Sequence, residues 1–194
     1  MRYPIVYIDP PWDYKGQKQH AGKGSSDTGG AASHYGTVKL SRLKQFPLQS
    51  LLADDALVFM WVTSPHLDQG IDLLRAWGLK YATVAFVWDK GRVNPGFYTM
   101  SQVEICLVAK RGRIPKPRGA RNVRQYVESP REAHSKKPDE VRRRIERMFP
   151  DLPRLELFAR GAVEGWDTWG DETTSDPEVD RVVRASEFFF ARKA

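Results

Sequence analysis

Residues 3–12 read YPIVYIDPPW, and this stretch decides how the chain folds. Its first six residues are mostly β-branched or aromatic, which is typical of a buried strand. The strand must end at Pro10 and Pro11, because proline cannot donate a ladder hydrogen bond in a central strand. In open α/β sheets, ligands bind outside the carboxyl ends of the strands. The stretch therefore predicts a strand over residues 3–8 that delivers Asp9 to a site where chemistry is expected.

Further along the chain, strand patterns alternate with helix patterns. Strands are predicted over residues 57–62, 83–88, 103–109 and 154–159. Helices are predicted over residues 40–52 and 66–77, from Pro138 onward, and from Pro177 to about Phe190. Residues 15–32, 91–96, 110–137 and 161–172 are predicted to be loops or turns. This alternation predicts an α/β fold with a mainly parallel sheet and helices on both faces.

The positive charge of the chain is concentrated in one segment. The 194 residues carry a net charge of +7, but residues 110–147 alone hold fourteen Lys/Arg against five Asp/Glu. Such a segment favours a polyanionic partner, because Lys and Arg that contact phosphates release condensed counterions. A solvated basic face is the alternative interpretation.

Other features exclude whole classes of protein. No apolar run is long enough to span a bilayer, so we expect no membrane partner. The single cysteine, Cys106, excludes an internal disulfide and fits the reducing cytoplasm, where we expect the protein to reside. The four histidines and Cys106 lack metal-ligand spacing, so we also expect no metal.

The loop Asp9-Pro10-Pro11-Trp12 fits one specific chemical problem. The exocyclic amine of adenine is a poor nucleophile, because its lone pair is delocalised into the ring. A carboxylate and a fixed backbone carbonyl that accept its N–H hydrogens favour the pyramidal amine that attack requires, and two prolines hold these acceptors in place. Trp12 offers a face on which an unpaired base can stack. We therefore assign the catalytic role to these four residues.

This loop resembles the DPPW signature of the MT-A70 family of adenine N6-methyltransferases, in its compact bacterial or phage form. The resemblance continues in family order over about residues 3–173. The further similar segments are His34-Tyr35-Gly36-Thr37, residues 57–63, Trp77-Gly78, residues 87–90, residues 104–108, Arg111-Gly112, residues 135–140 and residues 155–160.

The resemblance implies a Rossmann-like methyltransferase fold whose catalytic motif precedes the cofactor strand, and it implies S-adenosylmethionine as cofactor. Asp9 would bind the amine beside the cofactor, and Lys137 would help to hold the methionine carboxylate. The remaining implied cofactor residues are Tyr35 near the site, Arg160 toward the ribose, and Asp171 and Glu172 by the ribose or adenine. The family often has His-Asn and Asn-Gln where this chain has Ala162-Val163 and Asp171-Glu172, so the ribose contacts depart from the family pattern.

We expect one methyltransferase domain over residues 1–194, with insertions near residues 15–34 and 110–134 that recognise nucleic acid. The residues expected to contact it are Lys15, Lys18, His34, Arg111, Arg113, Lys116, Arg118, Arg121 and Arg124. DNA is favoured over RNA, because the chain lacks the extensions of the eukaryotic RNA enzymes.

Three alternatives stay open at this stage. The enzyme could act on RNA, the chain could be a catalytically silent nucleic-acid-binding subunit, or the acceptor could be an amine of a small molecule or of a protein glutamine. An intact catalytic tetrapeptide disfavours the second, and the basic segment disfavours the third. A homodimer and a complex with a partner methyltransferase subunit are both compatible with the sequence.

Overall fold

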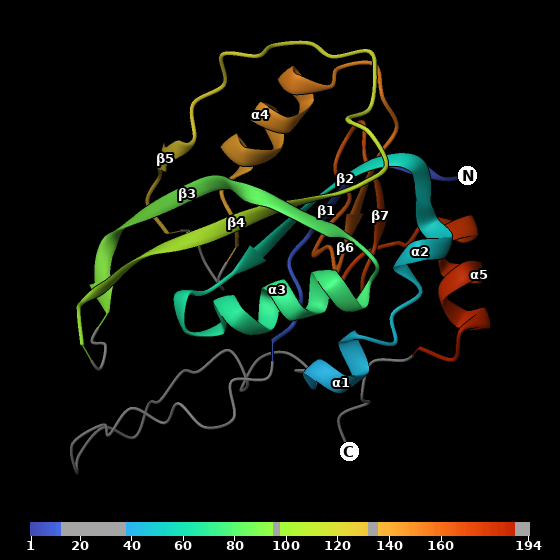
Figure 1. The fold of residues 1–194 in the computed structure, drawn as a ribbon, viewed down its shortest axis with the longest axis horizontal. Helices are drawn as coiled ribbons and strands as arrows, with labels where there is room; N and C mark the ends of the chain where they lie inside the picture. Colours follow the sequence, from blue (N-terminus) through green and yellow to red (C-terminus); the bar gives the residue numbers. More distant parts are fainter. Residues whose placement is uncertain (13–37, 95–97, 132–135, 189–194) are drawn as a thin grey trace.

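The computed structural model describes residues 1–12, 38–94, 98–131 and 136–188 of the chain (Figure 1). Seven strands form one sheet in the order β5-β3-β4-β2-β1-β6-β7. Their bounds are β1 Tyr3–Ile8, β2 Leu52–Val62, β3 Lys80–Asn94, β4 Ser101–Arg111, β5 Tyr126–Glu128, β6 Arg154–Leu157 and β7 Asp167–Trp169.

All neighbouring strands pair in parallel except β4, which runs antiparallel to both β2 and β3. The carboxyl ends of the other six strands therefore share one edge of the sheet, which we call the carboxyl edge. The chain leaves β1 toward β2 on one side and returns later to β6 on the other, so the β1–β6 boundary is a topological switch point. Asp9 follows β1 at this boundary, and the strand that carries the implied cofactor motif lies beside it.

Helices cover both faces of the sheet, but unequally (Figure 1). The alternation along β1 sends Val6 and Ile8 into one core, and Ile5 and Tyr7 into the other. Four helices pack on the first face: α1 Leu40–Leu43, α2 Leu48–Leu51, α3 Leu67–Ala76 and α5 Pro177–Ala185. On the second face, α4 (Asp139–Met148) buries Val141 and Ile145.

The predicted α/β architecture is confirmed, with its mainly parallel sheet and helices on both faces. The loop expected to be catalytic follows β1, which precedes β6 in the sequence while lying next to it in the sheet, as the permuted motif order requires. Cys106 is fully buried.

Several predicted boundaries are wrong, each for a local reason. The helix expected over residues 40–52 is split into α1 and α2, and Pro47 stands immediately before α2. Residues 91–94, expected in a loop, continue β3. Two short strands, β5 and β7, lie within segments expected to be irregular. Helix α5 ends at Ala185, before the predicted end. Residues 15–32 lie outside the described part of the chain.

Candidate active site

Four charged side chains of alternating sign form a chain at the carboxyl edge. Lys137 Nζ donates to Asp9 Oδ2 at 2.8 Å and lies 3.4 Å from Glu104 Oε2. Glu104 Oε1 in turn accepts from Lys90 Nζ at 3.4 Å. The side chains of Lys90, Glu104, Lys137 and Asp9 are 7%, 13%, 11% and 23% exposed, so the pairs lie largely out of water. We call these four residues the charge network.

The network controls the ionisation of Glu104. Burial raises the pKa of this carboxyl, but the neighbouring Lys137 and Lys90 ammonium groups outweigh burial and leave the pKa below its usual value. Glu104 therefore carries its negative charge at neutral pH. The network then contains two carboxylates and two ammonium groups, and its formal charges cancel.

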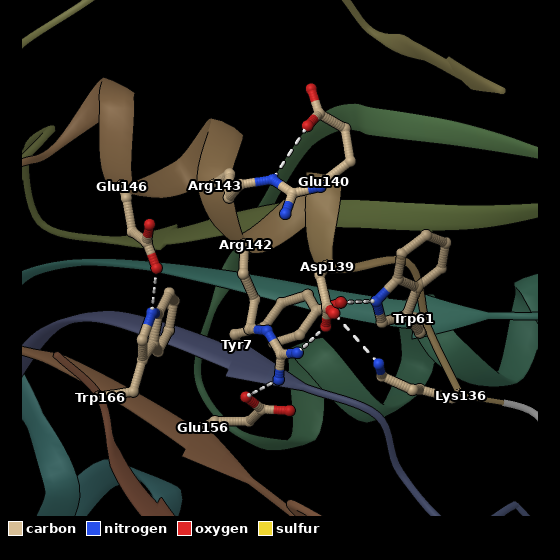
Figure 2. Close-up of polar contacts among 10 residues, drawn as sticks. All are labelled: Tyr7, Trp61, Lys136, Asp139, Glu140, Arg142, Arg143, Glu146, Glu156 and Trp166. Atoms are coloured by element: carbon tan, nitrogen blue, oxygen red, sulfur yellow. Dashed lines mark hydrogen bonds and ion pairs between the residues drawn. The ribbon is translucent and has the colours of Figure 1, made fainter. Parts of the chain in front are cut away.

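Helix α4 fixes the position of Lys137, which lies just before the helix begins. Near the start of the helix, Arg142 Nη1 donates to Glu156 Oε2 of β6 at 2.8 Å, and Arg142 also pairs with Asp139 (Figure 2). Lys136 Nζ donates to Asp139 Oδ2 at 3.0 Å. Burial raises the pKa of Glu156, although Arg142 opposes this shift. The start of α4 is thus joined by an ion pair to the strand next to β1.

Aromatic side chains of β1, β2 and β3 pack next to Lys137. Its ammonium lies 5.8 Å from the centre of the Trp61 ring, and Trp61 Nε1 donates to the Tyr7 hydroxyl at 2.5 Å (Figure 2). Trp61 also makes an edge-to-face contact with Trp88. A cation above an aromatic face is stabilised by the ring quadrupole, so the Trp61 ring stabilises the Lys137 ammonium in this position.

The Asp9-Pro10-Pro11-Trp12 loop is held by its own backbone and by Trp12. The Trp12 amide donates to the Pro10 carbonyl at 2.9 Å, and the Val38 amide donates to the Pro11 carbonyl at 2.8 Å. The Trp12 indole N–H donates to the Trp61 carbonyl at 3.2 Å. The Pro10 carbonyl retains a second lone pair, since a carbonyl oxygen can accept two hydrogen bonds.

The structure gives Trp12 a different role from the predicted one. Its side chain is 4% exposed and stacks on His66 with ring centres 6.2 Å apart, so its faces are not open to a base in this conformation. His66 is itself only 6% exposed, and its Nδ1 lies 2.9 Å from Thr63 Oγ1. Burial lowers the pKa of His66, although Asp68 opposes the shift. We therefore assign Trp12 to packing that fixes the loop.

A cavity of about 370 Å³ opens next to the end of β7. Asp171, Thr173 and Ser175 supply polar atoms to its lining, and Thr173 Oγ1 is a buried hydroxyl without a partner among the described residues. Gly170 is required there because a Cβ at this position would lie 2.1 Å from the Ala159 carbonyl oxygen. Of the other implied cofactor residues, Arg160 and Glu172 are exposed beyond β6 and β7 and do not line this cavity.

Comparisons with known proteins agree with this geometry. The model of the MT-A70 family matches residues 3–172. The chain belongs to the MT-A70 family. It is 47% identical over 181 residues to the Type II methyltransferase M.MunI of a Mycoplasma species, an alignment that covers 88% of this chain and 78% of the relative.

Eukaryotic MT-A70 proteins are more distant. The Arabidopsis thaliana N(6)-adenosine-methyltransferase MT-A70-like protein is 29% identical over 94% of this chain, and the human N(6)-adenosine-methyltransferase catalytic subunit METTL3 is 26% identical over 92%. The chain spans only 25% and 30% of the length of these two relatives.

Six of the residues predicted to contact nucleic acid lie in the described part of this MT-A70 protein, and none of them belongs to the charge network. Because β4 is antiparallel, Arg111 lies at the edge opposite Asp9, where it donates to the Gln49 and Leu52 carbonyls at 3.1 and 3.3 Å. The Arg113 amide donates to Asp55 at the same edge. Arg118 lies over the Phe149 ring, whereas Lys116, Arg121 and Arg124 are exposed. Lys15, Lys18, His34 and Tyr35 lie outside the described residues.

Sequence reasoning missed three residues of the site: Lys90, Glu104 and His66. Lys90 and Glu104 lie within segments that resemble MT-A70 motifs, but no role was inferred for them. One available signal was a glutamate inside the otherwise apolar run 103–109, because a charged residue in a central strand needs a partner. No comparable signal marks His66. Among the described residues, no helix is long and apolar enough to cross a membrane, and no three ligand-type side chains gather as a metal site would require.

Proposed function

We propose that this MT-A70 protein transfers a methyl group from S-adenosylmethionine to N6 of adenine in DNA. The observation that carries the proposal is the state of Asp9. Its Oδ2 is held by Lys137, while its Oδ1 has no hydrogen-bond partner among the described residues. The carboxylate is thus fixed at the switch point of the sheet with one acceptor oxygen available.

The chain supplies acceptors for the amine. Asp9 Oδ1 and the second lone pair of the Pro10 carbonyl would each accept an N–H of the adenine amine, which turns its nitrogen lone pair toward the methyl donor. Pro10 and Pro11 restrict the loop, and the Trp12 contacts anchor it, so little reorganisation is needed before attack. A base in a duplex has to be flipped out to reach this edge, which costs a few kcal/mol.

The residues present fit S-adenosylmethionine, which supplies an electrophilic sulfonium methyl group. Lys137, whose ammonium lies beside Asp9 and Glu104, would bind the methionine carboxylate through its positive charge. Asp171 lines the cavity beside the partnerless Thr173 hydroxyl, and these two polar groups suit the ribose hydroxyls. Tyr35, Arg160 and Glu172 complete the proposed set of cofactor residues.

The identities support DNA as the polymer. The chain is 47% identical to a bacterial Type II methyltransferase, but only 29% and 26% identical to the Arabidopsis thaliana and human N(6)-adenosine-methyltransferases. The exposed cations Lys116, Arg121 and Arg124 would contact phosphates, together with Lys15, Lys18 and His34. Arg113 and Arg118 also belong to the proposed set, whereas Arg111 does not, because its guanidinium already donates to the Gln49 and Leu52 carbonyls.

The test is methyl transfer from labelled S-adenosylmethionine to duplex DNA, single-stranded DNA and RNA, with the products digested to nucleosides. Wild-type protein is expected to label N6-methyladenine in DNA, and Asp9→Ala is expected to label nothing while it unfolds at a similar temperature. If only RNA is labelled, the methyl acceptor is RNA and not DNA. Label equal in wild type and Asp9→Ala would contradict the role of Asp9. No label despite cofactor binding would indicate a missing partner subunit or a different acceptor.

A further inference from the structure

The pair formed by Lys90 and Glu104 is not explained by the needs of the fold. Lys90 is a cation on β3 whose side chain is 7% exposed, and Glu104 is its partner among the described residues. A buried ion pair is weak support for stability, because desolvation offsets most of the attraction between the charges. The surrounding core of Trp88, Phe86 and Cys106 is apolar, so two apolar residues would pack there at least as well.

The pair does have a consequence for Lys137. Without Glu104, the Lys137 ammonium would be attracted to Asp9 alone and would bind it more closely. Without Lys90, the full charge of Glu104 would draw Lys137 away from Asp9. With both present, Lys137 is shared between two carboxylates, at 2.8 Å from Asp9 and 3.4 Å from Glu104.

We propose that Lys90 and Glu104 are positioning residues, which set where the Lys137 ammonium stands between the Asp9 carboxylate and the cofactor. Neither residue touches the reacting atoms. Glu104 fixes the second donor of Lys137, and Lys90 balances the charge of Glu104. The inference rests on the proposed function for the role of Lys137, and it adds two residues that no motif of the chain assigns.

The titratable groups around Glu104 determine how activity should respond to pH. Lys90 faces it from β3 and Lys137 from the start of α4, and Asp9 lies beyond Lys137. Tyr7 and Cys106 stay neutral near pH 7, because burial raises the pKa of both. Lys90 is thus one of two cations that keep the pKa of Glu104 low, and its removal raises that pKa.

The experiment compares Lys90→Met, Lys90→Arg and the double variant Lys90→Met/Glu104→Gln with wild type, using Lys80→Met as the matched control. Lys80 begins the same strand and is exposed. We expect Lys90→Met to lower kcat about tenfold with KM for DNA within about twofold, since misplacement of a positioned group affects the transition state most. The acidic limb of its kcat profile moves to higher pH. Lys90→Arg and Lys80→Met stay near wild type.

The double variant tests the balance of charge. Removal of both charges restores a neutral network, so it is expected to recover part of the activity that Lys90→Met loses. Affinity for S-adenosylhomocysteine, measured by calorimetry, gives a readout independent of the methyl acceptor, and Lys90→Met is expected to weaken it about fivefold.

Two results would overturn the inference. One is that Lys90→Met keeps the wild-type kcat, the wild-type position of the acidic limb of the kcat profile, and the wild-type affinity for S-adenosylhomocysteine. The other is that Lys90→Met, Lys90→Arg and the double variant lose kcat equally and in proportion to their loss of thermal stability. That result would mean that the pair is purely structural. If wild-type protein labels no DNA adenine, the proposed acceptor fails, and the S-adenosylhomocysteine affinities still decide whether the pair positions Lys137.

Discussion

The two edges of the sheet use charge in opposite ways. At the carboxyl edge, Asp9, Lys137, Glu104 and Lys90 are largely buried, and each has a partner of opposite sign. At the other edge, β4 leads into residues 112–125, which contain no acidic residue and expose Lys116, Arg121 and Arg124 to water. Buried, paired charges are fixed in position, as chemistry requires, whereas exposed cations of one sign suit contact with phosphates. Position in the sheet separates the two uses of charge.

The loop 112–125 belongs to a defined surface because it docks on α4. The Gly119 amide donates to Met148 and the Ala120 amide to Arg147, at 2.8 and 2.7 Å. Arg144 Nη1 donates to the Arg124 carbonyl at 2.8 Å. Since α4 starts at the charge network and ends beneath this loop, one helix connects the two regions.

The largest effect is expected at Lys137. Lys137→Met removes the donor to Asp9 and leaves the Glu104 carboxylate with one cation, so kcat/KM should fall about a hundredfold, as for other lost charged contacts of a transition state. Single-turnover methyl transfer and calorimetry with S-adenosylhomocysteine measure the two consequences. Lys136→Met is the control. Lys136 is the sequence neighbour of Lys137, but its ammonium pairs with Asp139 outside the charge network, so the loss of Lys136 should change the rate less than twofold. Equal rates for the two variants would remove Lys137 from the site.

A smaller effect is expected where packing supports the carboxyl edge. His66→Ala leaves Trp12 without its stacking partner, which should lower the unfolding free energy by about 2 kcal/mol and kcat about tenfold. His66→Phe keeps an aromatic face and loses the Thr63 contact, so it should recover most of the rate. Denaturant unfolding and single-turnover rates measure both quantities. A normal rate in His66→Ala would show that the loop holds its geometry without this stack.

Sequence patterns predicted the architecture well because the architecture depends on local and periodic signals. The run 3–8 followed by two prolines located both β1 and Asp9, and Pro138 with two acidic residues after it located the start of α4. Strands β5 and β7 were missed because each is three residues long, too short for any period to show.

The site was predicted less completely, because its contacts join distant strands. Lys137 and Asp9 are 128 residues apart in the chain, and their pairing depends on where α4 begins relative to β1. Lys90 and Glu104 meet only through the register of β3 with β4, which places Trp88 opposite Glu104. Arg111 lies far from Asp9 for a similar reason, since its distance from the site follows from the antiparallel direction of β4.

A smaller effect is expected in acid stability, to which Glu104 at the carboxyl edge contributes. The pKa of Glu104 is lowered in the folded state, so its charge stabilises the fold above the unfolded pKa, and this contribution is lost as pH falls through the folded pKa. In Glu104→Gln the decline in unfolding free energy below about pH 4.5 should be shallower than in wild type. Urea unfolding between neutral and acidic pH measures this slope. Arg121→Gln should keep the wild-type slope, because Arg121 is exposed and lies outside the charge network. A wild-type slope in Glu104→Gln would contradict the ion pairs.

The smallest effects are expected in the salt dependence of DNA binding. They distinguish the exposed arginines of the loop 112–125 from Arg111, which has partners within the protein. Arg121→Gln and Arg124→Gln should each reduce the salt dependence of DNA binding by about one unit of slope and weaken binding about threefold at moderate salt, because each lost phosphate contact releases about one counterion fewer. Arg111→Gln is the matched control, because its guanidinium donates to the Gln49 and Leu52 carbonyls. It should lower thermal stability and leave the salt slope unchanged. Fluorescence anisotropy across a salt series with a fixed duplex measures the slopes. The reverse pattern, a changed slope in Arg111→Gln alone, would place the DNA at the edge of the sheet and not over the loop and α4.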